Sequence, residues 1–385
     1  MSNILITMIE VGFGHKGPAL AIKNALDAAY PGQHSINVID FPLVAGAKRT
    51  DKTIKSAWNM ALRRPWMVRL SYTLMEAVYP LCDRVLYPFM ADFFIQGARY
   101  LAEHKPDLVV STHPMCSLVA ANARRRYGLR FPLVIDVVDP FDGYSLWAER
   151  TADLFLVHSV QSKELLVQHG IEAQRIKLVP YPRLPAMTIP SRSKEEIRRS
   201  WGIEPDGKPV ILVTSGAQGI GRVYSFVRRA YQADLPAYFF VVTGKNRKLY
   251  TELELLAQTG SLHPLQIKKN NSQNRACRLI PLSFVESMAE LYYICDIVVG
   301  KAGASTCMEA LFHQKPLVCT EWAGQNDYKI VEFLLQNNLG SFTPRYHDFL
   351  RLLKAPPVYE KYSSEFSTYG ILEALRSFHV VSGSM

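Results

Sequence analysis

The amino-acid sequence predicts an α/β protein of two Rossmann-like, doubly wound domains that face each other across a cleft. Short apolar runs, often β-branched, alternate with longer segments of helical period along most of the 385 residues. This alternation is typical of a parallel sheet covered by helices on both faces. It pauses once, in the proline-rich YPRLPAMTIPSRSKEE of residues 181–196, a candidate hinge. We therefore predict an N-terminal domain over residues 1–185 and a C-terminal domain over residues 200–385, whose last helix is free to pack back on the first domain.

The predicted elements follow the alternation in order. The expected strands of the first domain are 3–9, 36–41, 108–112, 133–138 and 154–158, with helices between them that include 18–29 and 117–127. The expected strands of the second domain are 210–214, 238–242, 278–281, 297–300 and 317–320, with helices over 223–232, 284–293, 306–313 and 328–336. Ligands of such sheets bind beyond the carboxyl ends of the strands, so function is expected in the strand-to-helix loops.

Charge and cysteine content restrict the class of partner. The formal net charge of +10 favours phosphates or an anionic membrane surface. No nucleic-acid-binding module is visible, and we expect no nucleic-acid partner. The six cysteines are scattered without metal-ligand spacing, which fits a reduced, cytoplasmic protein. We recognise no secretory signal, and charges interrupt the most apolar region, residues 66–94, so we expect no membrane-spanning helix.

A glycine-rich loop follows the first predicted strand. In VGFGHKG, Gly12, Gly14 and Gly17 form a G-x-G-x-x-G pattern, whose glycines allow a tight turn or a close approach to a ligand. A dinucleotide site would use Asp40, near the end of the second strand, to hold a ribose. However, His15 stands where the pyrophosphate would lie. The loop alone leaves open a dinucleotide site, another ligand site, and a structural turn with an exposed histidine.

The most specific segment is DIVVGKAGASTCMEALF in the second domain. A strand ends at Gly300, and a helix is expected to begin near Ser305 and Thr306, both good N-caps. The free N–H groups and the dipole of this helix form an anion site, which Lys301 strengthens. Glu309, expected on the first helical turn, can reach both hydroxyls of a ribose. Alternatively, Glu309 only improves the helix N-terminus.

Two further loops of the second domain supply small or polar residues. After the next strand, Gln325 and Asn326 carry amide groups suited to sugar hydroxyls. The LVTSGAQGIG stretch is a strand followed by Ser215, Gly216 and Gly219, which would let backbone N–H groups face a phosphate. The two loops and the helix start thus offer diphosphate, ribose and hexose contacts.

Together these motifs resemble the inverting GT-B glycosyltransferases of family 28. GFGH, SGAQG, GKAGASTCMEAL and the following AGQND look like the monogalactosyl- and processive glucosyl-diacylglycerol synthase branch. They are more distantly similar to the peptidoglycan N-acetylglucosaminyltransferase. The resemblance implies the GT-B fold and a nucleotide-sugar donor, most often UDP-linked. It favours a sugar-transferase loop around His15 over a nicotinamide fingerprint.

The resemblance also implies a role for each matched residue. The donor would be bound through its uracil, diphosphate, ribose and sugar by Phe284, Lys301, Gly303, Ala304, Ser305, Thr306, Glu309, Gln325 and Asn326. Gly14, Ser215, Gly216 and Gln218 would approach the phosphates. His15 would face the reacting centre, where an unperturbed pKa of about 6.5 suits a base or a cation.

This chain departs from the family pattern at two places. The lipid synthases commonly carry Pro-Gly-Gln-Glu where residues 323–326 read Ala-Gly-Gln-Asn, so the missing carboxylate leaves the hexose open. In VIDVVDPFDGYSLW, Asp136 and Trp147 fit the family pattern, but its histidine is absent. Asp136, Asp139 and Asp142 are all candidate bases, and we prefer Asp136 by its position.

The acceptor is expected to contact residues 60–94. Basic and aromatic residues occur together there, namely Arg63, Arg64, Arg69, Trp66, Tyr72, Tyr79, Tyr87, Phe89, Phe93 and Phe94. Such residues around apolar helix faces suit an interfacial surface that reaches a lipid, although aromatic stripes are also typical of a core. The region therefore predicts a lipid acceptor and an anionic membrane surface as partners.

The predicted function is the transfer of a hexose from a UDP-linked sugar to a hydroxyl of a lipid such as diacylglycerol. The enzyme would be cytoplasmic and peripheral on the inner face of the membrane. Helix N–H groups and Lys301 can take on the charge of the leaving diphosphate, so we expect no metal ion and no other cofactor. The alternatives are a soluble glycosyltransferase that acts on a small molecule or saccharide, and a nucleotide-sugar epimerase or sensor with the same fold.

Overall fold

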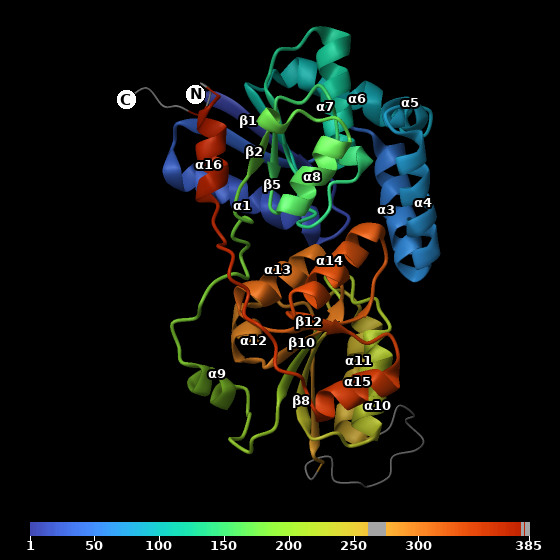
Figure 1. The fold of residues 1–385 in the computed structure, drawn as a ribbon, viewed down its shortest axis with the longest axis vertical. Helices are drawn as coiled ribbons and strands as arrows, with labels where there is room; N and C mark the ends of the chain where they lie inside the picture. The colour runs from blue at the N-terminus through green and yellow to red at the C-terminus, as the bar shows by residue number, and fades with distance from the viewer. Residues whose placement is uncertain (261–274, 379–380, 382–385) are drawn as a thin grey trace. The chain divides into compact units, whose positions relative to one another are not determined.

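The computed structural model describes all residues except 261–274, 379–380 and 382–385, and the chain forms two compact units (Figure 1). Unit 1 comprises Met1–Leu184, Gly324–Lys329 and Ser364–Met385, and unit 2 comprises Pro185–Ala323 and Ile330–Ser363. Each unit contains one parallel sheet of six strands. The last helix follows unit 2 in sequence but groups with unit 1.

Unit 1 is built on a sheet of strand order β2-β1-β3-β4-β5-β6. Its strands are β1 (Ser2–Met8), β2 (His34–Asp40), β3 (Leu108–Ser111), β4 (Leu133–Asp136), β5 (Leu154–Val157) and β6 (Ile176–Leu178). Its helices are α1 (Phe13–Ala29), α2 (Phe41–Val44), α3 (Lys48–Arg63), α4 (Pro65–Val78), α5 (Cys82–Leu86), α6 (Ala91–His104), α7 (Pro114–Tyr127), α8 (Val160–Gln168) and α16 (Tyr369–Arg376), with the 3₁₀ turns η1 (Ser145–Trp147) and η2 (Ala173–Arg175).

Side chains of β1 point alternately into two cores, one on each face of this sheet. Ile4 and Ile6 pack with α1 and α16, whereas Leu5 belongs to the core that includes α6 and α7 (Figure 1). Burial on both faces explains why the strands are continuous apolar runs rather than alternating ones. The helix α16 is fixed further by Arg376, whose Nε donates to the Tyr30 hydroxyl at 2.6 Å.

Unit 2 has the strand order β12-β11-β10-β7-β8-β9. Its strands are β7 (Val210–Thr214), β8 (Ala237–Val242), β9 (Cys277–Leu282), β10 (Ile297–Lys301), β11 (Leu317–Glu321) and β12 (Gly340–Phe342). Its helices are α9 (Lys194–Ser200), α10 (Val223–Gln232), α11 (Arg247–Thr259), α12 (Ala289–Ile294), α13 (Ala304–Phe312), α14 (Gln325–Gln336) and α15 (Tyr346–Lys354), although the first residues of α14 group with unit 1.

The structure corrects several predicted boundaries. The edge strands β6 and β12 were not predicted, since three residues are too few to give a pattern. The helix expected from residue 284 begins only at Ala289. The helix expected from residue 18 begins at Phe13, so the glycine-rich loop is its first turn. Gly17 makes room for this turn, because a Cβ there would lie 2.8 Å from the Phe13 ring.

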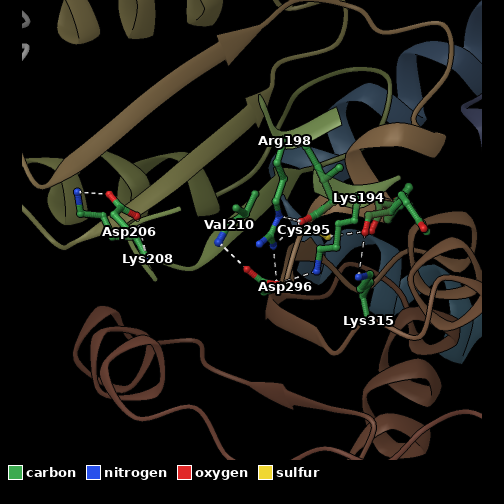
Figure 2. Close-up of polar contacts among 11 residues, drawn as sticks. Lys194, Arg198, Asp206, Lys208, Val210, Cys295, Asp296 and Lys315 are labelled. Carbon is green, nitrogen blue, oxygen red and sulfur yellow. Dashed lines mark hydrogen bonds and ion pairs between the residues drawn. The ribbon is translucent and has the colours of Figure 1, made fainter. Parts of the chain in front are cut away.

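Asp296, just before β10, holds the amino-terminal edge of the sheet in unit 2 (Figure 2). Its carboxylate accepts hydrogen bonds from Arg198 Nη2 at 2.7 Å, from Lys194 Nζ at 3.1 Å and from the Val210 N–H at 2.9 Å. Burial alone would raise the pKa of Asp296, but the Val210 N–H and the two cations lower it. The carboxylate therefore joins α9 to the starts of β7 and β10.

We expect Asp296→Ala to lower the free energy of unfolding by about 2 kcal/mol at pH 7, the scale of hydrogen bonds to a charged group. Because the folded-state pKa lies below the unfolded value of about 3.9, this stabilisation is present above that value. It disappears as the pH falls through the folded-state pKa. Urea denaturation at pH 7 and at pH 3 measures both quantities.

The control for this prediction is Asp348→Ala, since Asp348 pairs with an Arg345 side chain that is 81% exposed. An exposed pair of this kind contributes little to stability, so the loss should be much smaller than that of Asp296→Ala. Equal losses in the two variants would show that Asp296 has no special role in joining α9 to the sheet.

Within the described part of the chain, no helix has both the length and the apolar character needed to cross a bilayer.

In residues 60–94, Phe93 and Phe94 are buried core residues, whereas Trp66 and Phe89 are exposed. The side chain of Arg63 lies outside the described residues.

Candidate functional site

Each sheet has one switch point, a pair of neighbouring strands from which the chain order runs outward in opposite directions. In unit 1 this point lies between β1 and β3, and in unit 2 it lies between β7 and β10. In open α/β sheets the loops on the two sides of such a point diverge, and ligands bind there beyond the carboxyl ends of the strands. The residues after β1, β3, β7 and β10 are therefore the first to consider.

His15, on the first turn of α1, lies at the switch point of unit 1. Its Nδ1 is 2.6 Å from the carbonyl oxygen of Thr112, which follows β3. Because a carbonyl oxygen only accepts, Nδ1 carries the proton, and Nε2 of the neutral ring keeps a free lone pair. Burial lowers the pKa of His15, although the Asp139 carboxylate and the Thr112 carbonyl act to raise it. The ring is thus mainly neutral at pH 7, with a basic nitrogen available.

His113, Trp147 and Asp139 surround His15. The ring centroid of His113 lies 4.4 Å from that of His15, and the centroid of Trp147 lies 6.3 Å away. The Trp147 Nε1–H donates to Asp139 Oδ2 at 2.8 Å, and Asn326 Nδ2 donates to Asp139 Oδ1 at 3.0 Å, both within unit 1. A buried carboxylate and two aromatic rings thus lie near the His15 ring.

His113 was missed by the sequence reasoning. It is the N-cap of α7, where its Nδ1 accepts the Met115 N–H at 3.2 Å. In the neutral ring the proton is then on Nε2, so this nitrogen is a donor. Burial and the neighbouring His15 charge lower the pKa of His113 well below its usual value. Its position directly after the strand beside β1 is the signal that could have identified it.

The three candidate aspartates occupy different environments. Asp136, at the end of β4, is fully buried, and its Oδ1 lies 3.0 Å from His158 Nε2. Asp142 accepts the Tyr72 hydroxyl at 2.9 Å and the Gly143 N–H. Burial, followed by the Asp139 charge, raises the pKa of Asp142 to about 7. Asp136 stays a predicted base, but its carboxylate is engaged away from solvent.

The residues of the dinucleotide alternative are arranged differently from a ribose site. The Asp40 Oδ2 lies 2.6 Å from Lys55 Nζ, and its Oδ1 accepts the Glu10 N–H. Gly14 lies on the first turn of α1, with open space where a Cβ would be. Asp40 is therefore already paired, whereas the backbone at Gly14 stays accessible.

Two hydroxyls stand out at the switch point of unit 2. Ser215 follows β7, Ser305 lies on the first turn of α13 after β10, and Thr214 pairs with Gly300 across the two strands. Among the described residues, the Oγ atoms of Ser215 and Ser305 are buried and have no hydrogen-bond partner. Buried hydroxyls without partners are costly. Their position beside free helix N–H groups suits an anionic ligand.

The loop after β7 is packed tightly against its neighbours. Asn246 Nδ2 donates to the Gly219 carbonyl at 2.9 Å, and the Arg222 N–H donates to Glu321 Oε1 at 2.6 Å. A Cβ on Gly221 would lie 2.5 Å from both Glu321 Oε1 and Ser215 Oγ. Contacts with the loop after β8 and with the last residue of β11 thus hold the loop that carries Ser215 in place.

The start of α13 differs from the prediction. The N-cap is Gly303, without a side-chain cap, and the helix begins at Ala304. The helix therefore places Ser305 and Thr306 inside its first turn and Glu309 in the second turn rather than the first. Glycine at the N-cap offers no side-chain acceptor to the first N–H groups of the helix.

Glu309 is a buried carboxylate that is hydrogen-bonded to the Tyr292 hydroxyl. Burial raises the pKa of Glu309 to about 7, against the effect of this hydrogen bond. Tyr292 also hydrogen-bonds to Thr306 and stacks on His313, with ring centroids 5.6 Å apart. The carboxylate is thus held in one orientation, as recognition of two ribose hydroxyls would require.

The remaining predicted donor residues lie at the same sheet edge. Lys301 ends β10, and Gln325 begins α14. Gln218 is half-buried in the loop after β7, and Gly216 there has a φ of +72°. Phe284 follows β9 in the loop before α12 and is 54% exposed. These residues come from four different loops of unit 2 or its boundary.

Two family models match the chain. Residues 15–182 match the model described as monogalactosyldiacylglycerol (MGDG) synthase. Residues 210–328 match the model of the glycosyltransferase family 28 C-terminal domain. These matches confirm the resemblance predicted from the GFGH, SGAQG and GKAGASTCMEAL motifs.

Similar curated proteins include monogalactosyldiacylglycerol synthase 1, chloroplastic, of Arabidopsis thaliana. It is 23% identical over 358 residues, which cover 89% of this chain and 62% of that protein. The processive diacylglycerol β-glucosyltransferase of Bacillus pumilus is 28% identical over 215 residues, which cover 56% of this chain and 51% of that protein. The chain thus spans less than two thirds of the length of these relatives.

Similar solved structures include MurG of Acinetobacter baumannii. It has a TM-score of 0.53 and 15% sequence identity, with 92% of this chain and 90% of that chain covered. The UDP-GlcNAc 2-epimerase of Methanocaldococcus jannaschii has a TM-score of 0.54 and 10% identity, with 98% and 99% covered. These similarities confirm the GT-B type of α/β fold.

Proposed function

We propose that this chain is an inverting glycosyltransferase. Its residues 15–182 match the MGDG synthase model, and its residues 210–328 match the model of the family 28 C-terminal domain. It moves a hexose from a UDP-linked sugar to a hydroxyl of a lipid of the diacylglycerol class. The observation that carries this proposal is the pair of unpartnered hydroxyls of Ser215 and Ser305 at the switch point of unit 2, with the oriented Glu309 on the same helix as Ser305.

In the proposed reaction, the acceptor oxygen attacks the anomeric carbon while the bond from that carbon to the diphosphate oxygen breaks. The acceptor proton passes to Nε2 of His15, and UDP leaves with the electron pair of the broken bond. The nearby Asp139 carboxylate favours the imidazolium that forms. The Nδ1–H bond to Thr112 keeps the ring in the orientation that presents Nε2.

The charge of the leaving diphosphate is stabilised by Ser215, Ser305, Lys301 and the first N–H groups of α13. Preorganised donors of this kind act where charge develops and need not reorganise during the reaction. We therefore propose that the transfer needs no metal ion. Undiminished turnover in excess EDTA supports this proposal, and turnover restored only by Mg²⁺ contradicts it.

The acceptor proposal is supported by the surface of unit 1. Of the nineteen large apolar side chains exposed in the described chain, nine lie between Leu43 and Phe89. Residues 48–69 carry seven Lys or Arg and one Asp. An apolar surface beside positive charge binds an anionic bilayer. We propose peripheral binding at the cytoplasmic face of the membrane, with the lipid acceptor taken from that surface.

The test of the donor site is thermal unfolding with UDP, GDP, TDP, ADP or NAD. A ligand at a hundredfold its dissociation constant stabilises the fold by about 2.7 kcal/mol. We expect UDP alone to shift the melting temperature, and Glu309→Ala to abolish the shift. The control is Glu290→Ala, which removes a carboxylate on α12 that lies 2.6 Å from Arg192. This variant should bind UDP like the parent. A shift with NAD but not UDP would reject the proposed donor.

Transfer is then measured with labelled UDP-glucose and UDP-galactose. Label in an organic-extractable product supports the lipid acceptor. Label only in water-soluble product favours the soluble transferase, and epimerised UDP-sugar without any transfer favours an epimerase.

A further inference from the structure

The helix α4 has two faces with different partners. Trp66, Leu70 and Leu74 are 60%, 51% and 50% exposed, and their spacing of four residues places them in one stripe along the helix. α4 packs beside α3 in unit 1 (Figure 1), and Met75 and Val78 contact the core of that unit. The stripe is thus an unpaired apolar face on a helix that is anchored from its other side.

The anchored side of α4 makes polar contacts with the loop of residues 139–147. The Tyr72 hydroxyl donates to Asp142 Oδ2 at 2.9 Å. Glu76 Oε1 accepts the Ser145 N–H at 2.7 Å. The Tyr72 ring also packs on the Tyr144 ring, with centroids 4.8 Å apart. Two hydrogen bonds and a ring contact therefore connect one helix to one loop.

This loop supplies the surroundings of His15. The Asp142 N–H donates to the Asp139 carbonyl at 3.2 Å, so the two residues share one turn. Trp147, at the end of the loop, donates to Asp139 and lies 6.3 Å from His15, centroid to centroid. A shift of α4 would move Asp142 through the Tyr72 hydrogen bond. The turn from Asp139 to Asp142 and the Asp139–Trp147 hydrogen bond would then change the surroundings of His15, the proposed base.

The occupant of the stripe follows from the charges around it. Arg64 precedes the helix and Arg69 lies on it, and both are exposed. The preceding helix α3 adds Lys48, Arg49 and Lys52, whereas its Lys55 is paired with Asp40 and Asp51 at 2.6 Å each. An apolar stripe beside excess positive charge is complementary to an anionic lipid bilayer.

We propose that α4 couples membrane binding to catalysis, with Tyr72 and Glu76 as the positioning residues through which an anionic bilayer on the Trp66–Leu74 stripe sets the loop of residues 139–147. This inference rests on the proposed glycosyltransferase function and deepens it. Tyr72 was expected near the acceptor, but its hydroxyl bonds Asp142, and in this scheme neither Tyr72 nor Glu76 touches the reacting atoms. They act through Asp142 and Ser145.

The experiment measures kcat at saturating water-soluble short-chain diacylglycerol, with and without acceptor-free phosphatidylglycerol vesicles. Because the acceptor is saturating, its partitioning into the vesicles does not change the measured rate. We expect vesicles to raise the kcat of the parent by about fivefold or more, the lower end of typical coupling between sites. Leu70→Ser/Leu74→Ser should no longer co-sediment with the vesicles. Val167→Ser, which changes an apolar side chain that is 43% exposed on α8, should co-sediment and be stimulated like the parent.

The decisive variant is Tyr72→Phe, which removes only the hydroxyl that bonds Asp142. It should co-sediment like the parent and keep the UDP-induced thermal shift, but its kcat should no longer rise with vesicles. A purely structural role would instead lower kcat equally with and without vesicles. Tyr100→Phe, a hydroxyl deletion on α6 in the same unit, should be stimulated like the parent.

The outcomes separate this inference from the proposed function. If Tyr72→Phe is stimulated as strongly as the parent, or if the parent binds vesicles without stimulation, the coupling through α4 is wrong and the transferase proposal stands. If the parent transfers no sugar under either condition, the proposed function is wrong and this inference falls with it.

Discussion

His15→Ala is expected to lower kcat by about 10²–10⁴-fold, the usual contribution of a general base, while UDP binding is retained. The Nδ1–H bond to the Thr112 carbonyl leaves Nε2 as the basic atom, and alanine removes it. The donor residues Ser215, Ser305 and Glu309 belong to unit 2 and are unchanged by this substitution. Steady-state kinetics together with the UDP thermal shift therefore separate chemistry from binding.

The matched control for this variant is His104→Ala. His104, at the end of α6, also has Nδ1 close to a backbone carbonyl, that of Tyr100, at 2.8 Å. It lies on the exposed part of unit 1 and has no place in the proposed chemistry. A parental kcat in His15→Ala would exclude His15 as the base. Loss of the UDP shift in His15→Ala would instead assign the residue to donor binding.

The pH dependence of kcat/KM distinguishes His15 from Asp142 as the base. Burial lowers the pKa of His15 below 6.5, and a neutral ring is required to accept the proton. Activity should therefore be constant at pH 7 and above, and it should fall as the pH decreases through a value below 6.5. If the acidic limb lies near pH 7 instead, it matches a carboxyl group whose pKa is raised to about 7, either Asp142 or the donor-binding Glu309, and not His15.

The sequence predicted the features that local pattern controls. Ten of the twelve strands in the described residues were predicted, from short apolar runs that are often β-branched. The switch-point loops follow predicted strands, so the pattern alone selects His15, Ser215 and Ser305 as candidates. The glycine motifs and the GKAGASTCMEAL segment also gave the family resemblance. These signals depend on residues within about ten positions of one another, which a sequence displays directly.

The sequence could not predict contacts between distant segments. The hydrogen bond from Tyr72 to Asp142 spans 70 residues, and the pairing of Asp136 with His158 spans 22. Asp136 was preferred as the base by its position alone. Its burial could not be foreseen from the sequence, because that burial depends on helices that pack over the sheet. His113 was missed for the same reason, since its nearness to His15 requires β1 and β3 to be neighbours.

Gly219→Ala is expected to lower the free energy of unfolding by about 3 kcal/mol or more and to abolish the UDP-induced thermal shift. Gly219 has a φ of +58°, where a non-glycine residue costs about 1–2 kcal/mol. In addition, its Cβ would lie 1.9 Å from the Thr243 carbonyl oxygen, a backbone atom of the neighbouring loop that cannot rotate away. The loop after β7 would have to move, and the Ser215 hydroxyl would move with it.

Gly216→Ala separates the steric effect from the conformational one, because Gly216 has a similar φ of +72° but nothing within 4 Å of a Cβ. It should cost only about 1–2 kcal/mol, as measured by urea denaturation beside Gly219→Ala. Equal stability losses in the two variants would show that the Thr243 contact does not constrain the loop. If Gly216→Ala loses no more stability than this and yet loses the UDP shift, we infer that the donor fills the open space beside Gly216.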